Sequence, residues 1–144
     1  MSHDVTIGEM QSDEQIRATW DVMRQLRPHI RPEDYLAIVR RMMSTDGYRL
    51  AAVQQAGTVR AVAGYRFMEM LYCGRILYVD DLITDEHGRS RSHGKGLMEW
   101  LKAEARSRKC AELHLDSGVQ RGRAHRFYFR EGFTINAYHF HTAL

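Results

Sequence analysis

The residues best suited to chemistry in this sequence form a short stretch with two glycines. The stretch consists of Arg91, Ser92, His93, Gly94, Lys95, Gly96 and Leu97. It follows a predicted strand and opens a predicted helix, so its unpaired N–H groups and the positive end of the helix dipole would attract phosphate oxygens. Glycine also allows the backbone to approach a ligand closely. We therefore expect this turn to bind a pyrophosphate.

Other phosphate-binding motifs fit this stretch less well. A P-loop places Ser or Thr directly after its lysine to bind magnesium, whereas Gly96 follows Lys95 here. The first P-loop glycine and the three-glycine fingerprint of dinucleotide-binding folds are also missing from the sequence. A glycine pair at a helix start can also be turn chemistry without a ligand, and this alternative stays open.

A second group with chemical potential is the acidic pair Asp80 and Asp81, inside the predicted strand 75–84. Neighbouring strand residues point to opposite faces, so we expect only one carboxylate to face a given ligand, unless the strand is splayed there. A carboxylate can bind an ammonium group and take its proton, directly or through water. The alternative is a solvated or capping pair of acids.

Size and composition are those of one globular domain. The chain has 144 residues, 44% of them hydrophobic and 27% charged, and we expect a single domain over residues 1–144. Its net charge of +3 comes with interleaved acids, which does not favour nucleic acid as a partner. Because no long apolar run occurs, we expect a cytoplasmic protein without a membrane partner.

The cysteines and histidines do not predict a metal site. Cys73 and Cys110 lack the spacing of metal ligands and the density of a disulfide framework. His114 with Asp116, and His139 with His141, each share a predicted strand face, but such pairs more often form polar surface. We therefore expect no bound metal.

The hydrophobic pattern predicts the elements that position these groups. Ser12 and Gln15 form a capping box that opens a first helix, and Pro32 suits the first turn of a second helix. Ala56-Gly57 predicts a hairpin turn. The expected strands are 5–7, 48–54, 59–67, 75–84 and 112–117, and further helices are expected at 94–108 and before Gly132.

The C-terminal segment 133–144 completes the pattern with one or two closing strands. The resulting order is β-α-α-β-β-β-α-β-α-β, which predicts an α/β fold with a mixed sheet and helices on both faces. Because a final strand would leave an open edge, we also expect that a second copy covers it in a homodimer.

Two sequence signatures then relate the chain to a known family. The pattern Arg/Gln-x-x-Gly-x-Gly/Ala after a strand is matched by Arg91, Gly94 and Gly96. The pattern Ala-x-x-Phe-Tyr-x-x-x-Gly-Phe is matched by Ala124, Phe127, Tyr128, Gly132 and Phe133. With both signatures in order, and with this order of elements, the chain resembles the GNAT superfamily of N-acetyltransferases. The loop 85–92 is longer than in many members, and Ser92 replaces a frequent glycine.

The resemblance implies a mostly antiparallel GNAT sheet and an acyltransferase that moves acetyl from acetyl-CoA to a primary amine in a ternary complex. It implies that residues 91–97 bind the pyrophosphate and that Leu82, Ile83 and Thr84 pair with the pantetheine arm. The acidic strand is similar to that of spermidine/spermine acetyltransferases, which implies Asp80 as the base and Asp81 as a substrate contact. Tyr128 would then protonate the departing thiolate.

The acceptor is less defined by the sequence. Residues 116–133 are similar to aminoalkylphosphonate acetyltransferases, which favours a small amine. Protein lysine or N-terminal acetylation is the alternative among enzymes. A sensor that binds acyl-CoA without catalysis is the alternative outside them.

Overall fold

The computed structural model describes residues 4–88 and 91–144. By internal packing the chain divides into two compact units, Met1–His114 and Leu115–Leu144. A five-stranded sheet with the order β1-β2-β3-β4-β5 forms the centre of the first unit. Its strands are β1 (Val5–Glu9), β2 (Arg49–Gln55), β3 (Thr58–Met70), β4 (Gly74–Thr84) and β5 (Glu112–Leu115), and the last residue of β5 begins the second unit.

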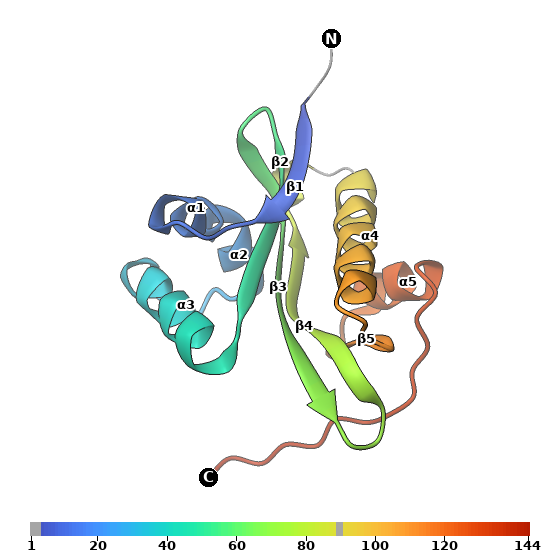
Figure 1. Cartoon of the computed structure of the whole chain (residues 1–144). Helices are drawn as coiled ribbons and strands as arrows, with labels where there is room; N and C mark the ends of the chain where they lie inside the picture. The colour runs from blue at the N-terminus through green and yellow to red at the C-terminus, as the bar shows by residue number, and fades with distance from the viewer. Residues whose placement is uncertain (1–3, 89–90) are drawn as a thin grey trace. The chain divides into compact units, whose positions relative to one another are not determined.

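Helices cover both faces of this sheet (Figure 1). Its helices are α1 (Asp13–Ala18), α2 (Trp20–Leu26), α3 (Pro32–Asp46), the short 3-10 helix η1 (Glu86–Gly88) and α4 (Arg91–Ser107). The first three α-helices lie on one face and α4 lies on the other. The first four strands pair antiparallel, so the predicted α/β fold with a mostly antiparallel sheet is confirmed. None of the described helices is long and apolar enough to cross a membrane.

Local signals in the sequence account for several of these elements. Ser12 and Gln15 form the predicted capping box, with the Gln15 N–H donating to the Ser12 hydroxyl oxygen over 3.1 Å. Pro32 occupies the first turn of α3, where its missing N–H needs no partner. Ala56 and Gly57 both have positive φ, which matches the twist of a tight hairpin.

The predicted first helix is instead two short helices that meet at Thr19. The Thr19 hydroxyl donates to the Ile16 carbonyl over 2.6 Å and lies 2.7 Å from the Tyr35 hydroxyl of α3. A threonine that bonds the preceding turn competes with helical backbone bonding, which favours a break at this position. The break changes the direction of the chain, and Met23 of α2 becomes part of the core beside α3.

The core lies on both sides of the sheet. Several side chains of β2, β3 and β4 are completely buried. Helix α4 adds a row of buried apolar side chains at helical spacing. The largest of these are Leu50, Val62, Tyr65, Ile76, Leu77, Leu97, Met98 and Leu101. Strand β4, which carries the acidic pair, therefore belongs to a sheet with packed side chains on both of its faces.

The second unit contains one helix, α5 (Gly122–Arg130), followed by Gly132 in a left-handed conformation with φ 90°. Residues 133–144 are all described, and they form neither helix nor strand. The prediction of one or two closing strands in this segment is therefore wrong for the single chain. An extended segment becomes a stable strand only when its backbone pairs with a neighbouring edge.

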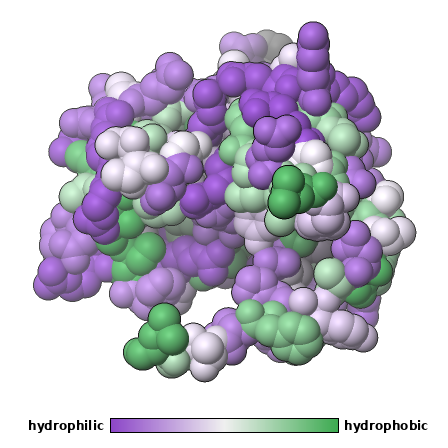
Figure 2. All heavy atoms as spheres, turned by 60° about the horizontal axis from the view of Figure 1, so that its bottom comes forward, coloured by the Kyte–Doolittle hydropathy of each residue, from purple (hydrophilic) through white to green (hydrophobic). Residues whose placement is uncertain are grey.

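Apolar side chains of this C-terminal segment are exposed instead. Ile135, Tyr138, Phe140 and Leu144 retain between 71% and 120% of their reference accessible area. Hydrophobic atoms form separate patches on an otherwise largely hydrophilic face in Figure 2. The apolar pattern of this segment thus leaves large side chains at the surface.

Candidate active site

An irregularity in β4 brings the two acids together. Gly64 of β3 lies opposite Asp81, and Tyr65 lies opposite Val79, so Asp80 is an extra residue without an opposite partner. Such a β-bulge interrupts the alternation of side chains along a strand. Asp80 and Asp81 consequently line the same pocket. The regular alternation of side chains therefore does not hold at this position, and which carboxylate faces a ligand stays a prediction.

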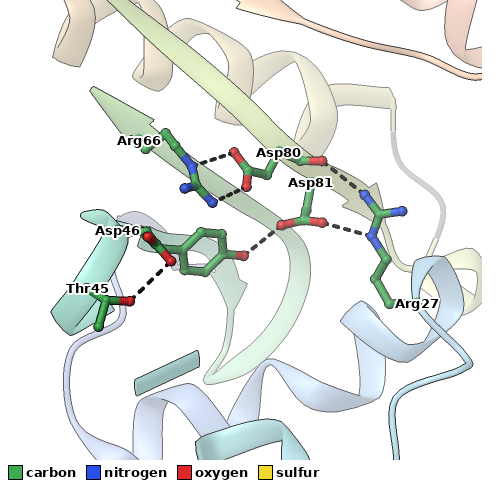
Figure 3. Close-up of polar contacts among 7 residues, drawn as sticks. Arg27, Thr45, Asp46, Arg66, Asp80 and Asp81 are labelled. Atoms are coloured by element: carbon green, nitrogen blue, oxygen red, sulfur yellow. Dashed lines mark hydrogen bonds and ion pairs between the residues drawn. The ribbon is translucent and has the colours of Figure 1, made fainter. Parts of the chain in front are cut away.

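Asp80 is paired with Arg66 of β3 in a two-bond arrangement. Arg66 Nε donates to Asp80 Oδ1 over 3.0 Å, and Arg66 Nη2 donates to Oδ2 over 2.5 Å (Figure 3). Burial raises the pKa of the Asp80 carboxyl above its usual range, and the bonds from Arg66 oppose that shift. Both side chains keep only about a fifth of their surface exposed, at 20% and 21%. Asp80 is therefore a carboxylate with increased affinity for a proton.

Asp81 is held by a different set of partners. Arg27, just after α2, donates from Nε to Asp81 Oδ1 over 2.9 Å, and the Tyr48 hydroxyl donates to Oδ2 over 2.8 Å. A second Arg27 nitrogen, Nη2, donates to the Asp80 carbonyl oxygen over 3.0 Å. Figure 3 shows Arg27 and Arg66 approaching the acidic pair from different sides. Each carboxylate thus has its own arginine.

The Tyr48 hydroxyl acts as a hydrogen-bond donor to Asp81. Burial, together with the negative charge of Asp81, raises the pKa of its phenol well above the usual value, so the hydroxyl keeps its proton. Gly64 makes room for it, because a Cβ at that position would collide with the Tyr48 hydroxyl and the Asp81 carboxylate. The tyrosine–aspartate bond therefore depends on a glycine inside a strand.

A pocket of about 350 Å³ lies over the acidic pair. It is lined by residues of α2, the following loop, α3, β4 and Tyr48. The lining residues are Met23, Arg27, His29, Ile30, Tyr35, Ile38, Val39, Met42, Tyr48, Tyr78, Asp80 and Asp81. Pockets for small ligands have volumes of roughly 300–1,000 Å³ and combine apolar walls with a few polar groups. The dimensions and the lining of this pocket suit a small organic molecule.

Sequence reasoning missed Arg27, Tyr48, Gly64 and Arg66. Only Gly64 left a usable signal, because glycine inside a strand commonly marks a bulge or a close approach. The others come from distant segments, and their roles depend on how α2, β3 and β4 pack. Their partners could not be assigned without the fold.

The last residues of β4 continue from the acids toward α4. Leu82, Ile83 and Thr84 pair on one side with β3. On the other side, the Ala111 N–H bonds the Arg75 carbonyl at the beginning of β4, and β5 continues for only four residues. A strand of that length cannot extend to the far end of an eleven-residue strand. Among the described residues, β5 therefore lies beside the beginning of β4 and not beside its last three residues.

The glycine stretch lies inside α4, which begins at Arg91 and not near residue 94 as expected. Ser92 and Lys95 are exposed, whereas His93, Gly94 and Leu97 are buried. A Cβ at Gly96 would lie 3.4 Å from Ile7 Cδ1, which is close to ordinary van der Waals contact, so α4 passes near β1 at this glycine. The Arg91 side chain, and residues 89–90 of the predicted loop, lie outside the described residues.

Tyr128 belongs to the second unit and lies on α5. Its ring packs edge-on against Phe127 and Phe133, with centroids 5.6 and 5.7 Å apart. Burial raises the pKa of its phenol, while Arg121 opposes the shift. Tyr128 is therefore a protonated hydroxyl in a partly buried aromatic cluster.

One group of side chains has donor types that a metal ion accepts. Single donor atoms of Cys73, Glu112 and His114 all lie within 4.8 Å of one another. His114 Nε2 is 2.6 Å from Glu112 Oε1, so this pair is satisfied without an ion. The sequence pattern paired His114 with Asp116 and His139 with His141. In the structure, Asp116 instead forms an ion pair with His139. The expected lack of a metal remains a prediction.

Two solved structures with a similar fold are N-acetyltransferases. An aminoglycoside N-acetyltransferase, AAC(6')-Iy in complex with CoA, aligns with a TM-score of 0.86 and 13% identity over 100% of this chain and 97% of its own. A glucosamine-6-phosphate N-acetyltransferase from Arabidopsis thaliana aligns with a TM-score of 0.74 and 18% identity, over 97% and 98% of the two chains. At these identities the likeness shows the fold alone.

Sequence comparison defines the family. Residues 14–133 match the Acetyltransferase (GNAT) family, and the chain belongs to it. It is 32% identical over 137 residues to an uncharacterized N-acetyltransferase, YhdJ, from Bacillus subtilis (strain 168), covering 94% of this chain and 96% of that protein. It is 28% identical over 97 residues to an aminoalkylphosphonate N-acetyltransferase from Salmonella typhimurium (strain LT2), covering 67% of this chain and 62% of that protein. The protein is therefore an acyltransferase of the N-acetyltransferase type.

Proposed function

We propose that the protein transfers an acetyl group from acetyl-CoA to the primary amine of a small molecule by direct attack in a ternary complex. The observation that carries the proposal is the pair Asp80 and Asp81 in one small pocket. This pair lies on the strand that leads toward the glycine-bearing start of α4. The match of AAC(6')-Iy, a structure solved with CoA, supports acetyl-CoA as the donor.

In this proposal Asp80 binds the ammonium form of the acceptor and takes its proton, directly or through one water. A free amine is largely protonated near neutral pH, and only its neutral form can attack. The raised pKa of Asp80 favours proton acceptance, and the bonds from Arg66 fix the carboxylate in place. Asp81 is a second contact to the same ammonium group, because its oxygens can accept further bonds beside those from Arg27 and Tyr48.

The neutral amine nitrogen then forms a bond to the acetyl carbon, and the carbon–sulfur bond breaks with its electron pair leaving on sulfur. Tyr128 gives its proton to that sulfur. The nitrogen releases its second proton to water as the amide forms, and water returns a proton to Tyr128 after that residue has protonated the sulfur. Support for this role comes from the family signature that includes Tyr128 and from burial, which keeps the phenol protonated. Neither cysteine is needed as a nucleophile in this scheme.

Acetyl-CoA binding is assigned to the end of β4 and the start of α4. Leu82, Ile83 and Thr84 offer backbone groups to the pantetheine arm beyond the reach of β5. The residues assigned to the pyrophosphate are Arg91, Ser92, His93, Gly94, Lys95, Gly96 and Leu97. Because α4 begins at Arg91, the N–H groups that the helix itself leaves without a partner are those of its first turn, and the positive end of the dipole there attracts anions. Exposed Lys95 adds a positive charge beside them.

The proposal treats residues 1–144 as one catalytic domain, because the family match spans residues 14–133 and so includes parts of both units. It also includes a homodimer. The exposed apolar side chains of the segment 133–144 support this assembly, since a second copy could cover them. A cytoplasmic location stays a prediction.

A product assay tests the proposed function. The full-length protein is incubated with acetyl-CoA and a panel of primary amines that includes aminoalkylphosphonates, polyamines, an aminoglycoside and lysine peptides. We expect coenzyme A release matched by an N-acetylated small amine in the mass spectrum. Acetylation of peptides alone would contradict a small acceptor. Failure of acetyl-CoA to bind the folded protein would contradict the whole proposal.

A further inference from the structure

The charges around the acidic pair are balanced within the protein. Asp80 has both oxygens bonded by Arg66, and Asp81 is bonded by Arg27. Two carboxylates are therefore matched by two guanidinium groups, and the pKa of Arg66 is raised further by its bond to Asp80, so its charge is permanent. The carboxylate oxygens still have lone pairs that can accept hydrogen bonds from one ammonium group. It offers no surplus negative charge to attract several cations.

The remaining lining of the pocket is mostly apolar. Ile30, Ile38, Val39 and Met42 come from the loop after α2 and from α3, and Met23 comes from α2. None of these side chains carries a group that could pair with a second cation. Burying an unpaired charge against them would be costly, because the cation loses its water without gaining a partner. The apolar lining favours a hydrocarbon portion of the acceptor.

Two of the three tyrosines that line the pocket, Tyr35 and Tyr48, also favour an apolar ligand. The Tyr48 hydroxyl donates to Asp81, and the Tyr35 hydroxyl lies 2.7 Å from Thr19, so both polar ends are occupied within the protein. Arg66 already lies over the Tyr48 ring, 5.8 Å from its centroid, which occupies one aromatic face with a cation. These tyrosines therefore contribute mainly aromatic surface to a ligand.

From this arrangement we infer that the acceptor is a primary monoamine with an apolar body, either an arylalkylamine or an alkylamine, and not a polycation. The inference rests on the proposed function and narrows its acceptor. The ammonium group binds at Asp80 and Asp81, and the hydrocarbon body packs on α3. Polyamines and aminoglycosides carry additional ammonium groups, and beside Asp80 and Asp81 the described lining offers them no further carboxylate.

A matched pair of amines tests this inference. Pentylamine and cadaverine have the same carbon chain, and cadaverine adds a second amine at its far end. We expect kcat/KM of the full-length protein to be about tenfold or more higher for pentylamine than for cadaverine, because the described lining offers the second ammonium no further carboxylate. In the same assay, kcat/KM should also be higher for phenethylamine than for spermidine and kanamycin. Equal or better turnover of the polycations would overturn the inference.

Two variants of α3 sharpen the test. Ile38→Glu places a carboxylate in the apolar lining and should shift the ratio toward cadaverine by about tenfold, because it supplies the missing partner. Ala37→Glu is the control, since Ala37 is exposed on the same helix and does not line the pocket. An equal shift in both variants would show that the ratio follows general charge and not the pocket, and would overturn the inference.

The results also separate the inference from the proposed function. If polyamines are acetylated best, the protein is still a small-amine acetyltransferase and only the inference about the acceptor fails. If lysine peptides are the only acceptors, or if no amine is acetylated, the proposed small acceptor fails and the inference fails with it.

Discussion

The acidic pocket and the C-terminal segment 133–144 differ in how their groups are satisfied within the single chain. In the pocket, both carboxylates of Asp80 and Asp81 have guanidinium partners, and Tyr48 completes the set. In the C-terminal segment, large side chains such as Phe140 are exposed and the backbone forms no regular element. The pocket is therefore preorganised by the fold, whereas the segment forms no strand despite its alternating apolar pattern.

The largest effect should follow from removing the proposed base. Asp80→Asn keeps the size of the side chain but removes its charge and its affinity for a proton. We expect kcat/KM for the best amine to fall by roughly 10²–10⁴-fold, the usual contribution of general acid–base catalysis. Asp21→Asn is the matched control, because the Asp21 side chain is 89% exposed and far less constrained. Similar rates in the two variants would remove Asp80 from catalysis.

The next effect concerns stability. Tyr48→Phe removes the donor to Asp81 and leaves a buried carboxylate oxygen without that bond. We expect a loss of about 1.5–3 kcal/mol in the free energy of unfolding, the usual contribution of a hydrogen bond to a charged group. Urea unfolding measures the change. Tyr72→Phe, at an exposed tyrosine, should change it by less than about 0.5 kcal/mol. Equal effects would show that the pocket network is not preorganised.

A smaller effect is expected on the pH dependence of activity. The base must be ionised, so kcat/KM rises with pH through the pKa of Asp80. Bonds from Arg66 lower that pKa, while burial raises it. Arg66→Gln should therefore move the acid limb of the profile to higher pH. Because the amine titrates identically with both enzymes, a shift reports the carboxylate. An unchanged limb, or a shift to lower pH, would contradict the role of this pair.

The smallest effect on catalysis should come from the C-terminal segment. Tyr138→Lys combined with Phe140→Lys places two charges on the proposed dimer surface. We expect the mass from light scattering to change from that of two chains to that of one. The thermal midpoint should lose its dependence on protein concentration, because dissociation no longer accompanies unfolding. A parent protein that is already a single chain in solution would contradict the homodimer.

Much of the fold could be predicted because its signals are local. The capping box at Ser12, the proline at the start of α3 and the hairpin turn at Ala56 each depend on a few adjacent residues. The break at Thr19 could not be predicted in the same way, since its hydroxyl also meets Tyr35 from another helix. Local pattern therefore predicts the elements better than their boundaries.

The site was only partly predictable for the same reason. The sequence indicated Asp80 and Asp81, but alternation along a regular strand placed them on opposite faces. The bulge that brings them together depends on how β3 and β4 pair, and Arg27 and Arg66 reach the acids from segments distant in the sequence. The closing strands failed because strand formation needs an edge to pair with, which a sequence pattern alone does not supply.

The most direct test of the central claim is a crystal structure of the protein with coenzyme A and a primary amine. Our account predicts that the amine nitrogen lies within hydrogen-bonding distance of the Asp80 carboxylate. It also predicts that the pyrophosphate lies against the backbone of residues 92–97. An amine bound outside the pocket on β4, or a pyrophosphate bound elsewhere on the protein, would contradict it.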